Sequence, residues 1–254
     1  MTMTKPGEPQ VPSAGGQARG NAEGEQALAP AHDAVVAIDG PAGSGKSTVA
    51  RSVAERTALR YLDTGSTYRA MTLALLRRGT PVDDREAVAE AARTVGIGLE
   101  LDPHPGAVSR VLLDGVPLPP EQLRSPEVNA AVSAVSAAPA VRRRLVALQR
   151  SVMAGGGVVA EGRDVGTVVC PEAQVKVFLT ASANERARRR GGPDGAGESA
   201  EQVARRDRLD SSRSASPTRA SEGALVIDST SRPVDDVVDE IVRLVEAVRA
   251  RRAR

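Results

Sequence analysis

The stretch that decides the fold runs from residue 34 to residue 48 and reads Ala-Val-Val-Ala-Ile-Asp-Gly-Pro-Ala-Gly-Ser-Gly-Lys-Ser-Thr. Its first six residues form a short apolar run, which predicts a buried strand. The run leads into the pattern G-x-x-x-x-G-K-[ST], and a helix is expected from residue 48 to about 59. Glycines let backbone N–H groups wrap a polyphosphate, and the helix N-terminus adds positive potential there. The stretch therefore predicts a nucleoside-triphosphate site on an α/β fold.

The phosphate loop, residues 40–48, carries its own chemistry. Lys46 is expected to reach the β- and γ-phosphates of ATP, and the Ser47 hydroxyl to ligate the accompanying Mg²⁺. The residues expected to bind ATP are Gly40, Pro41, Ala42, Gly43, Ser44, Gly45, Lys46, Ser47 and Thr48. The sequence contains neither the Asn-Lys-x-Asp motif of GTPases nor the Leu-Ser-Gly-Gly signature of transporter ATPases. The remaining interpretation is a kinase that passes the γ-phosphate of ATP to a small acceptor.

Short apolar runs elsewhere complete a parallel sheet. Together with 34–39, the predicted strands are 60–63, 157–160, 175–179 and 224–228. Helical patterns separate them at 68–78, 128–136, 141–153 and 234–248, and residues 249–254 are expected to be frayed. Strands alternating with helices predict the three-layer α/β fold of P-loop NTPases, with a five-stranded parallel sheet. Alternating runs at 98–102, 108–113 and 116–118, with a hairpin signal at Asp114-Gly115, predict a small antiparallel insertion.

Composition excludes several classes of function. The 254 residues are 41% hydrophobic but only 1% aromatic, which argues against modules that stack nucleic-acid bases. The net charge is +2, and no stretch could cross a bilayer, so we expect a cytoplasmic protein that binds neither nucleic acid nor membrane. The single Cys170 is expected to be buried and inert, and His32 and His104 are not expected to be catalytic. Residues 1–32 are rich in Gly, Ala and Pro and predict a disordered tail.

Charged residues follow two of the predicted strands. The segments 63–69 and 161–164 come directly after their strands, at the carboxyl edge where ligands of α/β proteins bind. A functional role for Arg163 is therefore favoured over a structural salt bridge. Farther on, Arg206, Asp210 and Arg213 have the spacing of one helix face. That face is either an exposed ion-pair stripe or an arrangement in which Asp210 orients two arginines toward phosphates, and spacing alone leaves both interpretations open.

From about residue 34 to the final helix, the sequence resembles the bacterial cytidylate kinases. The blocks that carry the resemblance are Ile-Asp-Gly-Pro-Ala-Gly-Ser-Gly-Lys at 38–46, Tyr-Leu-Asp-Thr-Gly-Ser-Thr-Tyr-Arg at 61–69, Arg-Ser-Pro-Glu-Val-Asn at 124–129, Gly-Arg-Asp-Val-Gly-Thr-Val-Val at 162–169 and Arg-Asp-x-x-Asp-x-x-Arg at 206–213. The fourth block is specific to this family among nucleotide kinases. Glu161 stands where Asp is commoner, and residues 191–197 are shorter and richer in Gly than many lids.

The resemblance implies a (d)CMP kinase that uses MgATP and acts as a monomer. The substrate-binding residues that it implies are Thr64, Tyr68, Arg69, Ser133, Arg142, Arg163, Asp164, Arg206, Asp210 and Arg213. Ser133, Arg142 and Asp164 fall where the family reads cytosine, and a carboxylate can accept from the cytosine N4 amine. The implied catalytic residues are Lys46, Arg163, Arg206 and Arg213. Which of Arg186, Arg189 and Arg190 meets ATP is left unassigned.

The resemblance also implies how the chain is divided. A core of 33–90 and 155–254 would carry a nucleoside-monophosphate-binding insertion at about 91–154 and a lid at about 186–213. Direct in-line transfer from MgATP to CMP or dCMP is expected, with no phosphoenzyme. The alternatives are a UMP/CMP, AMP or shikimate kinase, a catalytically silent nucleotide-binding module, and RNA binding through the arginine-rich helices.

Overall fold

A parallel five-stranded sheet forms the centre of the protein, as predicted. The computed structural model describes residues 1–2, 33–191, 201, 204–205, 207–208 and 218–254, so the tail predicted at 1–32 lies almost wholly outside it. The strand order is β2-β6-β1-β7-β8. The bounds are β1 Val35–Asp39, β2 Arg60–Asp63, β6 Val158–Gly162, β7 Val175–Thr180 and β8 Leu225–Asp228.

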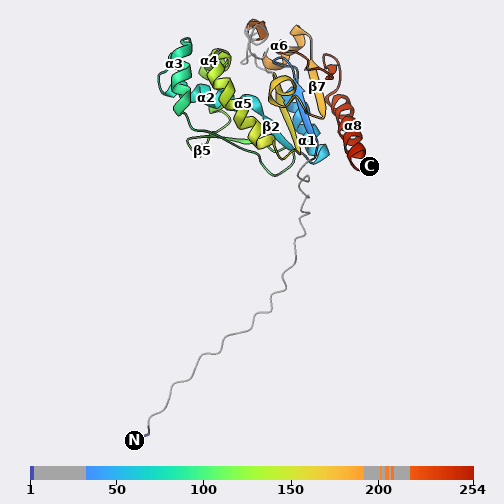
Figure 1. Cartoon of the computed structure of the whole chain (residues 1–254), viewed down its shortest axis with the longest axis horizontal. Coiled ribbons are helices and arrows are strands. Elements are labelled where there is room, and N and C mark those ends of the chain that lie inside the picture. Colours follow the sequence, from blue (N-terminus) through green and yellow to red (C-terminus); the bar gives the residue numbers. More distant parts are fainter. Residues whose placement is uncertain (3–32, 192–200, 202–203, 206, 209–217) are drawn as a thin grey trace.

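Helices cover both faces of this sheet, which gives the three layers predicted (Figure 1). On one face, α1 (Lys46–Thr57) and α8 (Val234–Arg252) pack against each other and against β1 through residues such as Val53 and Ile241. On the other face, α2 (Thr64–Arg77) and α5 (Pro139–Met153) bury side chains such as Val146 against Val35. All five residues of β1 are buried, as expected of a central strand covered on both sides.

The predicted antiparallel insertion is also present. It consists of β3 Ile97–Glu100, β4 Arg110–Leu113 and β5 Val116–Pro117. The hairpin between β4 and β5 turns at Asp114 and Gly115, both at positive φ (50° and 83°), as a two-residue turn of this kind requires. Two further helices pack beside it, α3 (Arg85–Thr94) and α4 (Pro126–Ala137). No helix was predicted at α3, and the predicted core boundary at residue 90 falls within it.

Two local predictions have clear outcomes. The expectation that residues 249–254 are frayed is wrong at its start, because α8 continues to Arg252. Arg249 donates a pair of hydrogen bonds to Asp33, just before β1, and a third to the Thr57 carbonyl, 2.8 Å away. Cys170 is buried as expected, and burial raises the pKa of its thiol to about 12. No helix in the described ranges is long and apolar enough to span a membrane.

Candidate active site

The phosphate loop joins the end of β1 to the start of α1. Gly43 and Gly45 adopt positive φ values of 75° and 88°, which side chains rarely tolerate. Gly40 lies so close to β7 that a Cβ there would come within 2.0 Å of the Leu179 carbonyl oxygen. The Gly45 carbonyl accepts the Val49 N–H at 3.0 Å, the hydrogen bond that closes the first turn of α1. The loop therefore presents its backbone at a helix N-terminus, the arrangement that binds phosphate.

Lys46 lies at the bottom of this loop with its ammonium group buried. Its Nζ donates to the Pro41 carbonyl at 2.8 Å, so the side chain curls back across the loop. Burial lowers the pKa of the Lys46 ammonium to about 7, and the nearby Arg163 guanidinium acts in the same direction. An incoming polyphosphate would reverse this balance, because it would supply the negative charge that stabilises the protonated amine.

Asp39, the last residue of β1, orders the segment that follows β6. Its two carboxylate oxygens accept the backbone N–H groups of Val165 and Gly166, each at 2.7 Å. These groups begin a π-helical turn, Val165–Val169, a feature that was not predicted. Burial raises the pKa of Asp39 to about 6. Asp39 thereby fixes the chain next to Arg163 and Asp164, although it lies more than 120 residues earlier in sequence.

A carboxylate and a hydroxyl meet where α1 approaches β6. Ser47 donates its hydroxyl to Glu161 Oε1 at 2.5 Å, and Tyr61 donates to the same oxygen at 3.0 Å. Oxygen atoms of this kind suit Mg²⁺. Among the described residues there is no cluster of three or more His, Cys, Asp or Glu side chains that could hold a metal ion by itself. The donor set therefore fits an ion shared with nucleotide phosphates.

A cavity of about 490 Å³ opens above these residues and contains most of the predicted site. The predicted residues that line it are Ala42, Gly43, Gly45, Lys46, Ser47, Thr48, Thr64, Tyr68, Arg69, Ser133, Arg142, Arg163 and Asp164. The predicted Arg206, Asp210 and Arg213 lie outside the described residues. The lining also includes polar residues that were not among the predicted site residues, such as Asp63, Arg124, Asn129, Ser136 and Glu161.

Positive side chains in this cavity are held by specific partners. Arg69 donates to the side-chain oxygen of Asn129 at 2.6 Å. Arg163 donates to the Gly40 carbonyl at 2.8 Å, which links the β6 edge to the phosphate loop. Guanidinium groups fixed in advance bind anions without paying for reorganisation.

A buried ion pair closes the far wall of the cavity. Arg142 of α5 pairs with Asp164, and both side chains are almost fully shielded from solvent. The Arg142 guanidinium also lies over the Tyr68 ring, 5.4 Å from its centroid. A flat aromatic ring, a guanidinium and a carboxylate thus form a polar, planar wall beside Ser133. Such a wall is suited to a small planar base.

Asp63 is an acidic member of the cavity that sequence reasoning missed. It caps α2 by accepting the Ser66 N–H at 3.2 Å. Burial, followed by the charge of Glu161, raises its pKa to about 6. The signal available in the sequence was its place at the carboxyl end of a strand, close to the position that Arg163 has after β6. Arg124 and Asn129 stand at the two ends of the 124–129 block that carries the family resemblance, but neither was given a role, because their place in the cavity depends on how α4 packs against α2.

The segment after β7 supplies further arginines. Helix α6 spans Ala183–Gly191, and both Arg189 and Arg190 line the cavity. Arg186 instead turns toward the outer side of the phosphate loop. It donates to the Ala42 carbonyl at 3.2 Å and pairs with Asp207, which in turn accepts the Ala42 N–H at 3.3 Å. Of the three arginines left unassigned, two therefore border the cavity.

Comparison with known proteins gives a consistent family. The cytidylate kinase family model matches residues 36–247. A cytidylate kinase of Mycolicibacterium paratuberculosis is 49% identical over 221 residues, which cover 84% of this chain and 95% of that protein. A cytidylate kinase of Pelotomaculum thermopropionicum is 45% identical, covering 84% and 96%. Among solved structures, a gluconokinase of Sinorhizobium meliloti aligns with a TM-score of 0.45 at 14% identity, over 87% of this chain and 95% of that one.

Proposed function

The chain belongs to the cytidylate kinase family and phosphorylates CMP with ATP, and we propose that it does so by direct in-line transfer inside the 490 Å³ cavity. The observation that carries this proposal is that one cavity joins the phosphate loop to the arginines of the acceptor side. A donor phosphate over Lys46 and an acceptor phosphate near Arg69 would thus occupy neighbouring positions. The acceptor phosphate is already anionic, so the reaction needs no covalent intermediate and no dedicated base.

The side chains that line the cavity then have roles that their positions support, whereas the roles of Arg206, Asp210 and Arg213 rest on the family resemblance. Lys46 would contact the transferred phosphate, with Arg163 stabilising its charge from the β6 edge. Arg69 would hold the CMP phosphate, beside Thr64 and Tyr68. The wall of Ser133, Arg142 and Asp164 would read cytosine, with Asp164 accepting from the N4 amine. Arg206 and Arg213 would contact phosphate, and Asp210 would hold these arginines and touch the ribose.

Mg²⁺ fits the oxygen donors found beside the loop. Ser47 would ligate it together with the ATP phosphates, and the Glu161 carboxylate is close enough to orient Ser47 or a bound water. The ion would neutralise charge on the phosphates during transfer.

The proposal extends to dCMP as a second acceptor, to a monomeric enzyme and to a cytoplasmic location. It also keeps the division of the chain into a core, 33–90 and 155–254, an acceptor-binding insertion at about 91–154 and a lid at about 186–213.

An acceptor panel tests the substrate. Purified protein is given MgATP with CMP, dCMP, UMP or AMP, and nucleoside diphosphate formation is measured by a coupled assay. We expect CDP and dCDP to form, with UMP and AMP at least an order of magnitude slower. Equal rates with AMP and CMP would contradict the assignment of the cytosine wall. Tight MgATP binding with no CDP would favour a silent nucleotide-binding module.

A single substitution tests the role of Arg163. R163A should lower kcat roughly 10³-fold, by analogy with arginine fingers in other phosphoryl-transfer enzymes. R243A, on the exposed side of α8, is the matched control and should keep wild-type kcat. A loss of less than tenfold in R163A would remove Arg163 from the catalytic set.

A further inference from the structure

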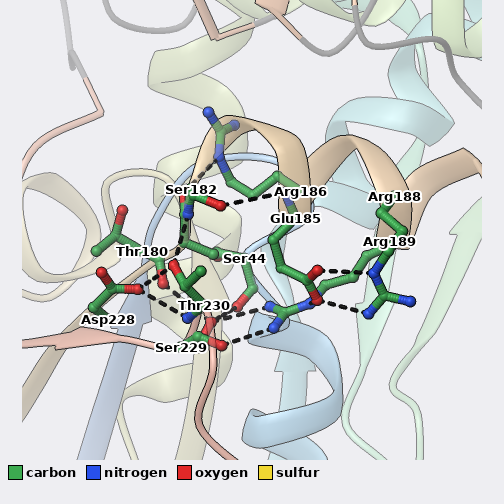
Figure 2. Close-up of polar contacts among 11 residues, drawn as sticks. Ser44, Thr180, Ser182, Glu185, Arg186, Arg188, Arg189, Asp228, Ser229 and Thr230 are labelled. Carbon is green, nitrogen blue, oxygen red and sulfur yellow. Dashed lines mark hydrogen bonds and ion pairs between the residues drawn. The ribbon is translucent and has the colours of Figure 1, made fainter.

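Two residues from distant segments meet the phosphate loop at Ser44, and the proposed function gives neither of their side chains a role. Ser229 follows β8 directly, Arg189 lies on α6, and Ser44 is the residue before Gly45 of the loop. Figure 2 shows the polar contacts that link the end of β8 to α6. Because α6 opens the predicted lid, these contacts connect a lid helix to the loop that binds phosphate.

Ser229 is the centre of this cluster and is only 5% exposed. Its hydroxyl lies 3.1 Å from the Ser44 carbonyl oxygen and 3.0 Å from that of Thr180. A hydroxyl has one hydrogen, so it donates to one carbonyl at a time and keeps its lone pairs for donors. The backbone N–H of Ser229 is fixed separately, to Thr180 at 2.8 Å. The backbone hydrogen bond therefore holds Ser229 in place whichever of the two carbonyls its hydroxyl donates to.

Arg189 donates hydrogen bonds to the oxygens of Ser229. Its Nη1 donates to the Ser229 hydroxyl at 3.0 Å and its Nη2 to the Ser229 carbonyl at 2.7 Å, while Nε donates to Glu185 at 2.7 Å. A guanidinium carries five N–H donors, so these three contacts leave donors for a ligand. Arg189 borders the cavity, and its Nη1 lies 3.5 Å from where a Cβ on Gly45 would stand.

The neighbouring Arg188 shows what sets Arg189 apart. Arg188 pairs with the same Glu185 but points to solvent, with its side chain 73% exposed against 27% for Arg189. Arg189, unlike Arg188, donates from the two Nη atoms of its guanidinium to two oxygens of the buried Ser229. A guanidinium held in this way loses little freedom when an anion binds beside it.

We propose that Arg189 contacts the phosphates of the donor nucleotide from the α6 side of the loop, and that Ser229 is the positioning residue that holds it there. Ser229 ties the position of Arg189 to that of the Ser44 backbone, so that the cation and the loop are aligned together before ATP arrives. This inference rests on the proposed function, since it assigns the donor to this loop.

The test separates donor from acceptor. S229A and R189K should each raise the KM for ATP, and the Kd for MgATP measured by titration without CMP, about tenfold, while the KM for CMP stays within twofold. Lysine cannot grip both oxygens of Ser229, which is why R189K should behave like S229A. The conservative S229T, which keeps the hydroxyl, should restore at least half of the lost affinity.

Two matched controls keep this result specific. S109A removes a serine that is also 5% exposed but whose hydroxyl has no hydrogen-bond partner within the described residues. R188K changes the solvent-facing neighbour of Arg189. Both should keep the wild-type Kd for MgATP.

A double-mutant cycle tests the positioning role itself. If Ser229 acts through Arg189, the S229A/R189K variant should bind MgATP no worse than R189K alone. Three results would each overturn the inference: a double variant whose loss of MgATP affinity is the product of the two single losses, a wild-type Kd in R189K, or equal effects on ATP and CMP. Should S229A fail to fold, R189K against R188K decides the Arg189 contact by itself. Because MgATP binding is measured without transfer, a protein that made no CDP would refute the proposed function and still leave this inference open to its own result.

Discussion

The ion pair of Arg142 and Asp164 bears on both the stability of the fold and the recognition of the acceptor base. Both side chains are nearly inaccessible to solvent, so each charge depends on the other for stabilisation. The pair also forms the cavity wall that we assign to cytosine recognition. Its position was expected only as part of a binding site, because sequence alone does not show that the two residues, 22 positions apart, bury each other's charge.

Removing Asp164 should therefore affect stability and specificity together. D164A leaves the Arg142 charge buried without its carboxylate, and we expect a loss of about 3–5 kcal/mol in the free energy of unfolding. The preference for CMP over UMP should fall at the same time, in assays run below the lowered melting temperature. Urea denaturation and the acceptor panel measure the two effects.

The exposed pair of Glu100 and Arg110 gives the control for this change. E100A should alter stability by about 1 kcal/mol or less and leave acceptor preference unchanged. If D164A kept wild-type stability, the ion pair would not be the support that its burial indicates.

Lys46 should make MgATP binding dependent on pH. Burial lowers the pKa of its ammonium to about 7, and a bound triphosphate requires the protonated form. Below pH 7 the Lys46 amine is already charged before MgATP binds, whereas above pH 7 each binding event takes up a proton. The Kd for MgATP should weaken roughly tenfold per pH unit between pH 7.5 and 9.

Isothermal titration in buffers of different ionisation enthalpy checks this directly, with proton uptake approaching one at pH 8.5. K46R is the control, since arginine does not titrate in this range. A Kd for wild-type protein that did not change between pH 7.5 and 9 would show that Lys46 is charged before ATP binds.

At the scale of elements, the end of α8 is tied to the start of β1. Arg249 grips the Asp33 carboxylate with two nitrogens and also reaches the end of α1 at Thr57. Burial of Asp33 works against its ionisation, but the hydrogen bonds from Arg249 and the Ala34 N–H, together with the charges of Arg249 and Arg252, outweigh it and hold the pKa of this carboxyl below 3.8. The stabilisation from this pair is therefore present above pH 3.8 and is lost as pH falls through the pKa of the folded state.

D33N should cost about 1 kcal/mol of unfolding free energy at pH 7, a value reduced for the partial exposure of Arg249. The difference from wild type should shrink as pH falls below 3.8 and through the pKa of the folded state. Urea denaturation at several pH values measures it. D239N is the control, because its pair with Arg56 is about half exposed on both sides and should contribute little. A stability loss in D33N that did not change with pH would mean that the charge of the Asp33 carboxylate does not stabilise the fold.

Elements were predictable where one segment carried its own signal. The five strands were each recognisable from a short apolar run, and Asp114-Gly115 marked its hairpin through the positive φ that both residues adopt. Helix α3 had no such signal, since only Val88 and Ala92 of its ten residues are buried. The π-helical turn after β6 depends on Asp39, a partner from another strand that no local pattern reveals.

The same distinction holds for the site. Lys46, Ser47 and Arg163 were identified from motif and strand-end position. Asn129 was not given a role, because its grip on Arg69 exists only once α4 packs against α2. The prediction for residues 249–254 failed for a similar reason: a basic helix end looks solvated in sequence, yet its first arginine finds Asp33 more than 200 residues away.

At the scale of the whole molecule, the described fold and the family match begin at nearly the same residue, Asp33 and residue 36. The family model begins at residue 36, and relatives that are 45–49% identical align over nearly their full length but over only 84% of this chain. Toward the N-terminus, the described contacts begin with Asp33. Its pair with Arg249 joins the start of β1 to the end of α8, which packs with α1 on one face of the sheet (Figure 1).

A chain that starts with Met followed by Asp33 should therefore retain full activity. We expect kcat and the KM values for ATP and CMP to stay within twofold of the full-length protein, and the melting temperature within about 2 °C, because the described contacts of the proposed site all involve residues after Asp33. A chain that starts at residue 36 is the comparison: it loses Asp33 together with the buried Ala34 and Val35, and should lose more stability than D33N. If the first truncation lost activity while keeping its melting temperature, residues 1–32 would contribute to catalysis itself, and the boundary of the catalytic unit would have to be moved to include them.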